Sequence, residues 1–160
     1  MNEKILDLSP LCMRARGFVS QGRIDDALGI YSDVLQVDPS NALAHADRGT
    51  AYAMLKKFDL ALDDLEKAIA LGYENSSVFC TVATIYFEKK QHRKALDYFA
   101  KAAEVDPSYP LIYYNRSNVL HELGDSNAAI ADLEKCLSFD PEDNLKELIA
   151  RRLDLLRAQR

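Results

Sequence analysis

The sequence predicts an all-α protein built from antiparallel helix pairs that stack on one another. One observation is an internal repeat: four consecutive segments of 34 residues, 8–41, 42–75, 76–109 and 110–143, follow one pattern without a gap. A second is that each segment carries two apolar faces with the 3.6-residue period of a helix. A third is a Pro or Gly near the end of each segment, where a helix must stop.

The repeat is defined by residue size at fixed positions, counted from the first residue of each segment. Position 20 is alanine in all four segments, position 8 is small, and positions 11 and 24 are large and apolar. Such a register, kept four times in succession, indicates a repeat protein. The residues are Ala27, Ala61, Ala95 and Ala129 at position 20; Ala15, Gly49, Ala83 and Ser117 at position 8; Phe18, Tyr52, Tyr86 and Leu120 at position 11; and Tyr31, Leu65, Phe99 and Leu133 at position 24.

These positions explain how two helices can pair. Positions 4, 7, 8 and 11 share one face of a first helix, and positions 20, 24, 27 and 28 share one face of a second. Small residues at positions 8 and 20 let the helices approach closely, and large residues at positions 11 and 24 fill the space beside them. Because one pair cannot bury its own apolar face, the pairs are expected to stack into a continuous core.

The helix ends are marked by residues that do not continue a helix. Pro39 and Pro107 each follow an aspartate at the end of a second helix. Tyr73 replaces this proline in the second segment, where Gly72 is expected to end the helix in a left-handed conformation. The turn within each segment has Gly22, Lys56, Lys90 and Gly124 at the same position.

A closing helix is predicted over about residues 141–158. Asp140 is suited to cap this helix and Pro141 to begin it. One face is apolar and the opposite face is basic, and we interpret the basic face as a solvated surface rather than a binding patch. The apolar stripe consists of Leu145, Leu148, Ile149, Leu153 and Leu156.

Segments such as ALAHADRGTAYAMLKKFDLALDDLEKAIALGYEN resemble tetratricopeptide repeats, and the resemblance covers residues 8–143. The 34-residue length and the small–large–Ala–aromatic–Pro pattern carry it. The resemblance implies a right-handed α-solenoid, a single domain over residues 1–160, and a concave groove lined by the first helix of each repeat. It also implies a module that binds another protein.

Helix geometry predicts which residues face this groove. If positions 4, 7, 8 and 11 point into the repeat, positions 2, 5, 6, 9, 12 and 13 point away from it. Their mixed character favours a neutral or mildly basic extended segment, or an amphipathic helix, of a partner protein. The predicted contact residues are Met13, Arg16, Asp47, Thr50, Met54, Thr84, Phe87, Tyr114, Asn115, Asn118 and Glu122; the same positions also include Cys12, Val19, Ser20, Ala46, Cys80, Glu88 and Leu111.

A subset of the family binds the acidic C-terminal tails of heat-shock chaperones with a clamp of Lys, Asn and Arg. The clamp positions can be aligned with this sequence starting at the first repeat or at the second. Neither alignment supplies two cations that could face a carboxylate. The resemblance therefore points away from this subset. The corresponding positions hold Cys12, Arg16, Asp47, Ser77 and Thr81, or, one repeat later, Ala46, Thr50, Thr81, Leu111 and Asn115.

Charge, histidine placement and missing motifs argue against nucleic-acid binding, metal binding and catalysis. The formal net charge is −5 at pH 7, whereas a nucleic-acid binder needs a dense basic stripe. The histidines His45, His92 and His121 lie in three different segments, so no metal site is expected. No catalytic motif or phosphate-binding glycine loop occurs, so we expect neither a cofactor nor an enzyme.

Two functions remain open at this stage. The first is an adaptor that binds a peptide or helix in the groove. The second is a structural or assembly subunit that self-associates, or sits in a larger complex, through its convex or terminal surfaces. Three isolated cysteines, no apolar run long enough to span a membrane and no signal-peptide pattern predict a cytoplasmic location, if the sequence is complete.

Overall fold

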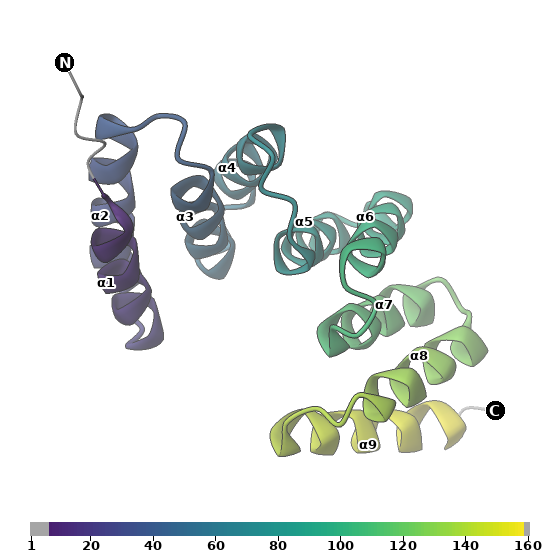
Figure 1. Cartoon of the computed structure of the whole chain (residues 1–160). Helices are drawn as coiled ribbons and strands as arrows, with labels where there is room; N and C mark the ends of the chain where they lie inside the picture. The colour runs from purple at the N-terminus through teal and green to yellow at the C-terminus, as the bar shows by residue number, and fades with distance from the viewer. Residues whose placement is uncertain (1–6, 159–160) are drawn as a thin grey trace. The chain divides into compact units, whose positions relative to one another are not determined.

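A computed structural model describes residues 7–158; residues 1–6 and 159–160, and with them both ends of the predicted domain, lie outside this range. The described residues form nine α-helices joined by short connections (Figure 1). None of these helices is long and apolar enough to cross a membrane. The helices are α1 (Ser9–Ser20), α2 (Ile24–Val37), α3 (Ala42–Met54), α4 (Phe58–Ala70), α5 (Ser76–Glu88), α6 (His92–Val105), α7 (Pro110–Glu122), α8 (Ser126–Ser138) and α9 (Asp143–Ala158).

The chain divides into two compact units, Met1–Glu74 and Asn75–Arg160, which we call unit 1 and unit 2. In unit 1, α1 packs against α2 and α3 against α4; in unit 2, α5 packs against α6, α7 against α8, and α9 against α8. Each of the first four pairs falls within one 34-residue segment of the sequence. The all-α class of paired, stacked helices is therefore confirmed.

Small residues at the centre of each pair let its two helices touch. A Cβ atom added at Gly49 would lie 2.8 Å from Cγ of Leu65 and 3.0 Å from the carbonyl oxygen of Ala61, so α3 and α4 meet with no room for a methyl group. The alanines at position 20 are all fully buried. The large residues at position 24 fill the space beside them and are buried as well: Tyr31, Leu65, Phe99 and Leu133.

A residue in the left-handed region closes the turn inside each pair. The φ angle is 75° at Gly22, 55° at Lys56, 59° at Lys90 and 83° at Gly124. For lysine this conformation costs about 1–2 kcal/mol, which glycine avoids. Gly72, with φ 86°, follows α4 in the same way, as the sequence predicted.

An ion pair joins the two helices of one pair in each unit. In unit 1, Arg48 donates from Nε and Nη2 to the two carboxylate oxygens of Asp64, at 2.7 and 2.9 Å. In unit 2, Arg116 donates to Asp132 in the same bidentate way, with both distances 2.7 Å. Both aspartates are buried, so each arginine satisfies a carboxylate that would otherwise be costly to bury.

The side chain at position 4 of a repeat can bond the first helix to the loop that precedes it. In unit 1, the two ring nitrogens of His45 lie 2.8 Å from Oδ1 of Asp64 and 3.1 Å from the carbonyl oxygen of Pro39. At the equivalent position in unit 2, the hydroxyl of Tyr113 donates to the carbonyl oxygen of Pro107 at 2.6 Å. His45 therefore has a structural role that an aromatic residue fills elsewhere.

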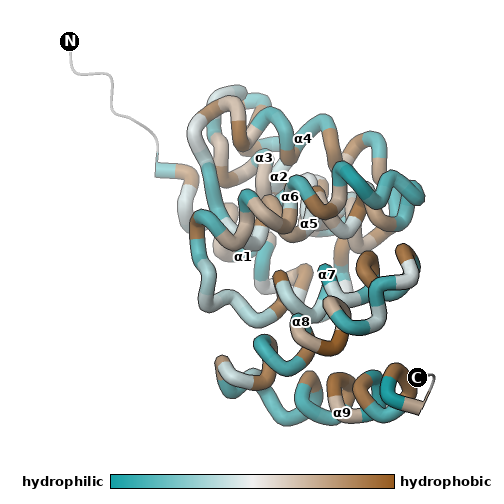
Figure 2. The backbone as a smooth tube through the Cα atoms, turned by 90° about the vertical axis from the view of Figure 1, so that its right-hand side faces the viewer, coloured by the Kyte–Doolittle hydropathy of each residue, from teal (hydrophilic) through white to brown (hydrophobic). Residues whose placement is uncertain are grey.

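The closing helix begins two residues later than the sequence indicated. α9 starts at Asp143, and Asp140 does not cap it, because its φ angle of 50° turns the chain before Pro141. Asp140 instead pairs with Nζ of Lys146 at 2.7 Å. Apolar and polar residues alternate along α9 (Figure 2), and the buried members of its apolar stripe are Ile149, Leu153 and Leu156.

Alanine at Gly29 and at Gly49 should have opposite effects on stability. Gly29 lies on the exposed side of α2 with nothing within 4 Å of an added Cβ, so Gly29→Ala should raise the free energy of unfolding by about 0.5–1 kcal/mol. Gly49→Ala should lower it by about 1–3 kcal/mol, because the methyl group meets α4. Urea denaturation followed by circular dichroism measures both changes. A Gly49→Ala variant as stable as Gly29→Ala would contradict the close approach of α3 and α4.

Candidate functional site

Part of the predicted groove face is buried. Cys12 of α1 and Cys80 of α5, both at position 5, are almost inaccessible, and so is Ala46. The first helices pack against each other as well as against their own partners, α1 on α3 and α5 on α7. At these three small residues, position 5 therefore belongs to the packing between repeats and not to an open surface, whereas Tyr114 at the same position of α7 stays partly exposed.

Unit 1 has a hollow of about 320 Å³ between α1 and α3. Tyr31 reaches it from α2, and its side chain is buried. Five of the residues that the register assigned to the groove meet here, although they come from two different helices. The lining residues are Arg16, Val19, Ser20, Tyr31, Asp47, Thr50 and Ala51.

An ion pair crosses this hollow from α1 to α3. Arg16 donates to Asp47 from Nε at 2.8 Å and from Nη2 at 3.2 Å. The side chain of Arg16 is 51% exposed and that of Asp47 only 18%. Burial raises the pKa of Asp47 above its usual value, and the hydrogen bond from Arg16 opposes this shift. Burial also raises the pKa of Tyr31, so the hollow contains one paired carboxylate and a neutral phenol.

The other predicted residues of unit 1 offer apolar contact. Met13 and Met54 are exposed. The hydroxyl of Thr50 donates to the backbone carbonyl of Ala46 at 2.8 Å, so its hydrogen is already used within α3. Methionine side chains adapt readily to different partner shapes.

Glu122, a predicted contact residue at the end of α7, belongs to a second charged group, in unit 2. Nζ of Lys90 lies 3.0 Å from both carboxylate oxygens of Glu122, and the His92 ring lies 3.5 Å from one of them. Phe87 lies beside this group, with its ring centroid 5.8 Å from that of His92. The sequence places Lys90 in the turn and not at a groove position. Because it neutralises Glu122, this surface is less acidic than the residues at the groove positions alone indicate.

Three further predicted residues lie along α5 and α7. The hydroxyl of Thr84 donates to the backbone carbonyl of Cys80 at 2.9 Å. Asn115 donates to Sγ of Cys80 at 3.5 Å, and burial raises the pKa of this thiol to about 11. The side-chain amide of Asn118 is partly exposed and makes no hydrogen bond to another described residue, so it is available to bond to a ligand.

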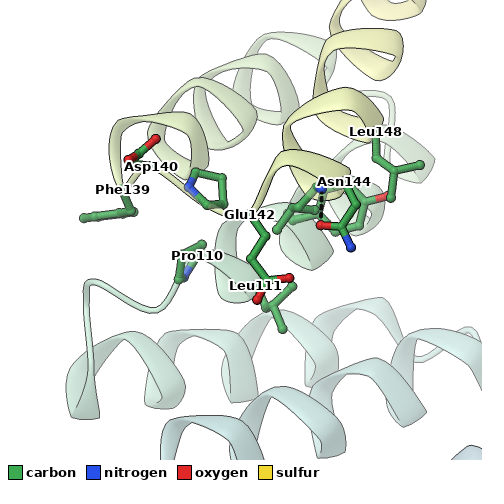
Figure 3. A pocket seen from close by; sticks show the side chains of 10 residues that line it. Pro110, Leu111, Phe139, Asp140, Glu142, Asn144 and Leu148 are labelled. Carbon is green, nitrogen blue, oxygen red and sulfur yellow. Dashed lines mark hydrogen bonds between the residues drawn. The ribbon is translucent and has the colours of Figure 1, made fainter.

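Unit 2 contains a larger hollow of about 570 Å³ where α7 and the start of α9 face each other (Figure 3). Tyr114, a predicted contact residue, lines it together with Leu111. The remaining lining residues come from the first residue of α7, from the α8–α9 connection and from α9, which the sequence indicated only as a closing helix. They are Pro110, Phe139, Asp140, Pro141, Glu142, Asn144, Leu145 and Leu148.

Three family models of the tetratricopeptide repeat match this sequence. Two are described as "Tetratricopeptide repeat" and match residues 12–75 and 111–143; the third, "TPR repeat", matches residues 83–124. The chain belongs to the tetratricopeptide repeat family.

Similar proteins are themselves repeat proteins. Human "Tetratricopeptide repeat protein 6" is 30% identical over 146 residues, which are 88% of this chain and 28% of that protein. The structure of pilF from Pseudomonas aeruginosa has a TM-score of 0.77 at 23% identity, covering 95% of this chain and 75% of the other. The first TPR of Spaghetti (RPAP3), bound to the HSP90 peptide SRMEEVD, has a TM-score of 0.68 at 22% identity, covering 73% and 93%. These structures share the fold, and the chain spans little more than a quarter of the human relative.

Removing the cation of the unit 1 ion pair should make stability depend more strongly on pH. In Arg16→Gln, the buried carboxylate of Asp47 loses its partner, so the pKa of Asp47 should rise further. A group with a raised folded-state pKa lowers stability as pH rises through that pKa. The variant should therefore be about 1 kcal/mol less stable than the parent at pH 7 and closer to it at pH 3. Carboxyl NMR and urea denaturation at both pH values measure these changes; an equal loss at both would contradict the coupling.

Proposed function

We propose that this chain is a protein-interaction module that binds a peptide segment or a helix of a partner protein along the exposed faces of its first helices. The hollow of unit 1 is the observation that carries the proposal. Arg16 of α1 lies far in the sequence from Asp47 and Thr50 of α3, yet the three line one concave feature of the size that can take a side chain. Tetratricopeptide repeats are typically non-catalytic scaffolds, which agrees with this role.

The charges on these faces favour a neutral or mildly basic partner. Arg16 is already paired with Asp47, and Lys90 with Glu122, so neither cation is free to attract an acidic segment. Glu88, at the end of α5, is exposed and adds a negative charge. A partner would gain more from apolar contact with Met13 and Met54, and from hydrogen bonds to Asn118, than from negative charge.

The three cysteines bear on location. Cys12, Cys80 and Cys136 are free thiols, and all three are buried. Unpaired cysteines are typical of a reducing compartment. A cytoplasmic location, which these thiols support, is therefore part of the proposal.

Arginine at the proposed contact faces should block partner capture. Thr50→Arg fills the hollow of unit 1, and Asn118→Arg replaces the free amide of unit 2, so each should reduce capture of partners from cell extract at least tenfold. Ala70→Arg and Ala100→Arg make the same change at exposed positions of the outer helices α4 and α6 and should leave capture unchanged. Quantitative mass spectrometry of crosslinked partners measures the difference.

Gel filtration of the same variants separates the proposed role from an assembly role. The chain should elute near its mass of 18.0 kDa, with or without the substitutions. A mass larger by an integer factor, together with capture that Thr50→Arg and Asn118→Arg do not change, would favour self-association through other surfaces and would contradict groove binding.

An acidic chaperone tail should not bind. The HSP90 peptide SRMEEVD, bound in the Spaghetti structure, ends in a carboxylate. Within residues 7–158, the cations beside the proposed contact faces, Arg16 and Lys90, are already held by Asp47 and Glu122 and are not free to receive it. Isothermal titration should show no saturable binding at micromolar concentrations. Micromolar binding that is lost when the terminal carboxylate is amidated would overturn this expectation.

A further inference from the structure

The hollow of unit 2 is an apolar site that the closing helix completes. Leu111 of α7 and Leu148 of α9 line it, yet their exposed fractions are 37% and 49%. The buried stripe of α9 runs instead through Ile149 and Leu153, so Leu148 is not needed to hold the helix in place. A volume of about 570 Å³ falls within the range of about 300–1,000 Å³ that is typical of ligand sites.

The charges around this hollow determine what can enter it. Lys146 is the nearby cation, and it is already held by Asp140 at 2.7 Å and by Asp143 at 3.3 Å. Glu142 lines the hollow, its side chain reaches toward Leu111 (Figure 3), and no ion pair within residues 7–158 involves its carboxylate. The site therefore combines an apolar floor with one unpaired negative charge.

A ligand that covers this floor also removes water from Glu142. A purely apolar ligand would leave that carboxylate desolvated and unpaired, which is unfavourable, and an acidic ligand would be repelled. A ligand with a cation beside its apolar group would replace the lost water with an ion pair. Charge complementarity thus selects one kind of ligand.

We propose that this hollow binds a segment of a partner protein in which a large apolar side chain is followed or preceded closely by a lysine or arginine. The apolar side chain packs between Leu111, Tyr114 and Leu148, and the cation pairs with Glu142. The inference rests on the proposed function, since Tyr114 belongs to both surfaces, and it adds the chemistry of the partner and a role for α9.

A phage-displayed random peptide library selected on the full chain tests this proposal. The selected peptides should combine Leu, Ile, Met or Phe with an adjacent Lys or Arg, and their binding should shift the NMR signals of Leu111, Tyr114 and Leu148. Leu148→Asp should weaken the best peptide at least tenfold, and Leu148→Ala should weaken it less. Because Leu148 is half exposed, both variants should keep the parent's circular dichroism spectrum.

A charge reversal provides the sharpest comparison. Glu142→Lys should weaken the basic peptide about tenfold or more and should favour a matched peptide in which Glu replaces the cation. Glu104→Lys makes the same change at an exposed position of α6, outside the hollow, and should leave both affinities unchanged. Peptides without a cation, or an unchanged preference in Glu142→Lys, would overturn the proposal.

The unit 1 variant separates this inference from the proposed function. If Thr50→Arg blocks partner capture while Leu148→Asp and Glu142→Lys do not, the module stands and the α7–α9 site fails. If none of the three changes capture, both fail. A dimer in gel filtration that Leu148→Asp dissociates would mean that a second copy of the chain occupies the hollow, which would also overturn the proposal.

Discussion

The close contact of two helices across small residues is the constraint from which the rest of each unit follows. At Gly49, α3 and α4 meet so closely that a Cβ atom would lie 2.8 Å from a Leu65 carbon. Helices this close leave room beside the contact for large side chains such as Tyr31 and Leu65, which become fully buried. Within each unit, the outward faces of the first helices pack only in part against each other, α1 on α3 and α5 on α7, and the rest of these faces stays exposed.

Buried polar groups in these pairs are satisfied within the repeat. Asp64 and Asp132 each receive a bidentate arginine from the first helix of the same pair. These aspartates need no group from a ligand, because both carboxylate oxygens of each already accept a hydrogen bond from arginine. The more exposed pair of Arg16 and Asp47 extends this internal neutralisation toward the proposed contact surface. What remains for recognition is mostly shape and apolar area, which suits an adaptor.

The closing helix shows how one element can serve stability and binding together. Ile149, Leu153 and Leu156 face inward and cover the last repeat, while Leu148 is left half exposed beside a hollow. The two roles are compatible because a helix presents different faces at intervals of three and four residues. The turn at Asp140 matters here, since it delays the start of α9 and leaves Pro141 and Glu142 to line the hollow.

Much of the fold can be predicted from the sequence, and much of the site cannot. The 34-residue register, the small residues at positions 8 and 20 and the left-handed residue at Gly72 were all readable, because local sterics and helix periodicity decide them. The burial of Cys12, the pairing of Lys90 with Glu122 and the hollow beside α9 were not, because each depends on how neighbouring helices approach one another. The sequence by itself determined that helix pairs form and which faces they bury. Only the tertiary structure decided which outward residues meet, since distances between helices depend on the packing of many side chains at once.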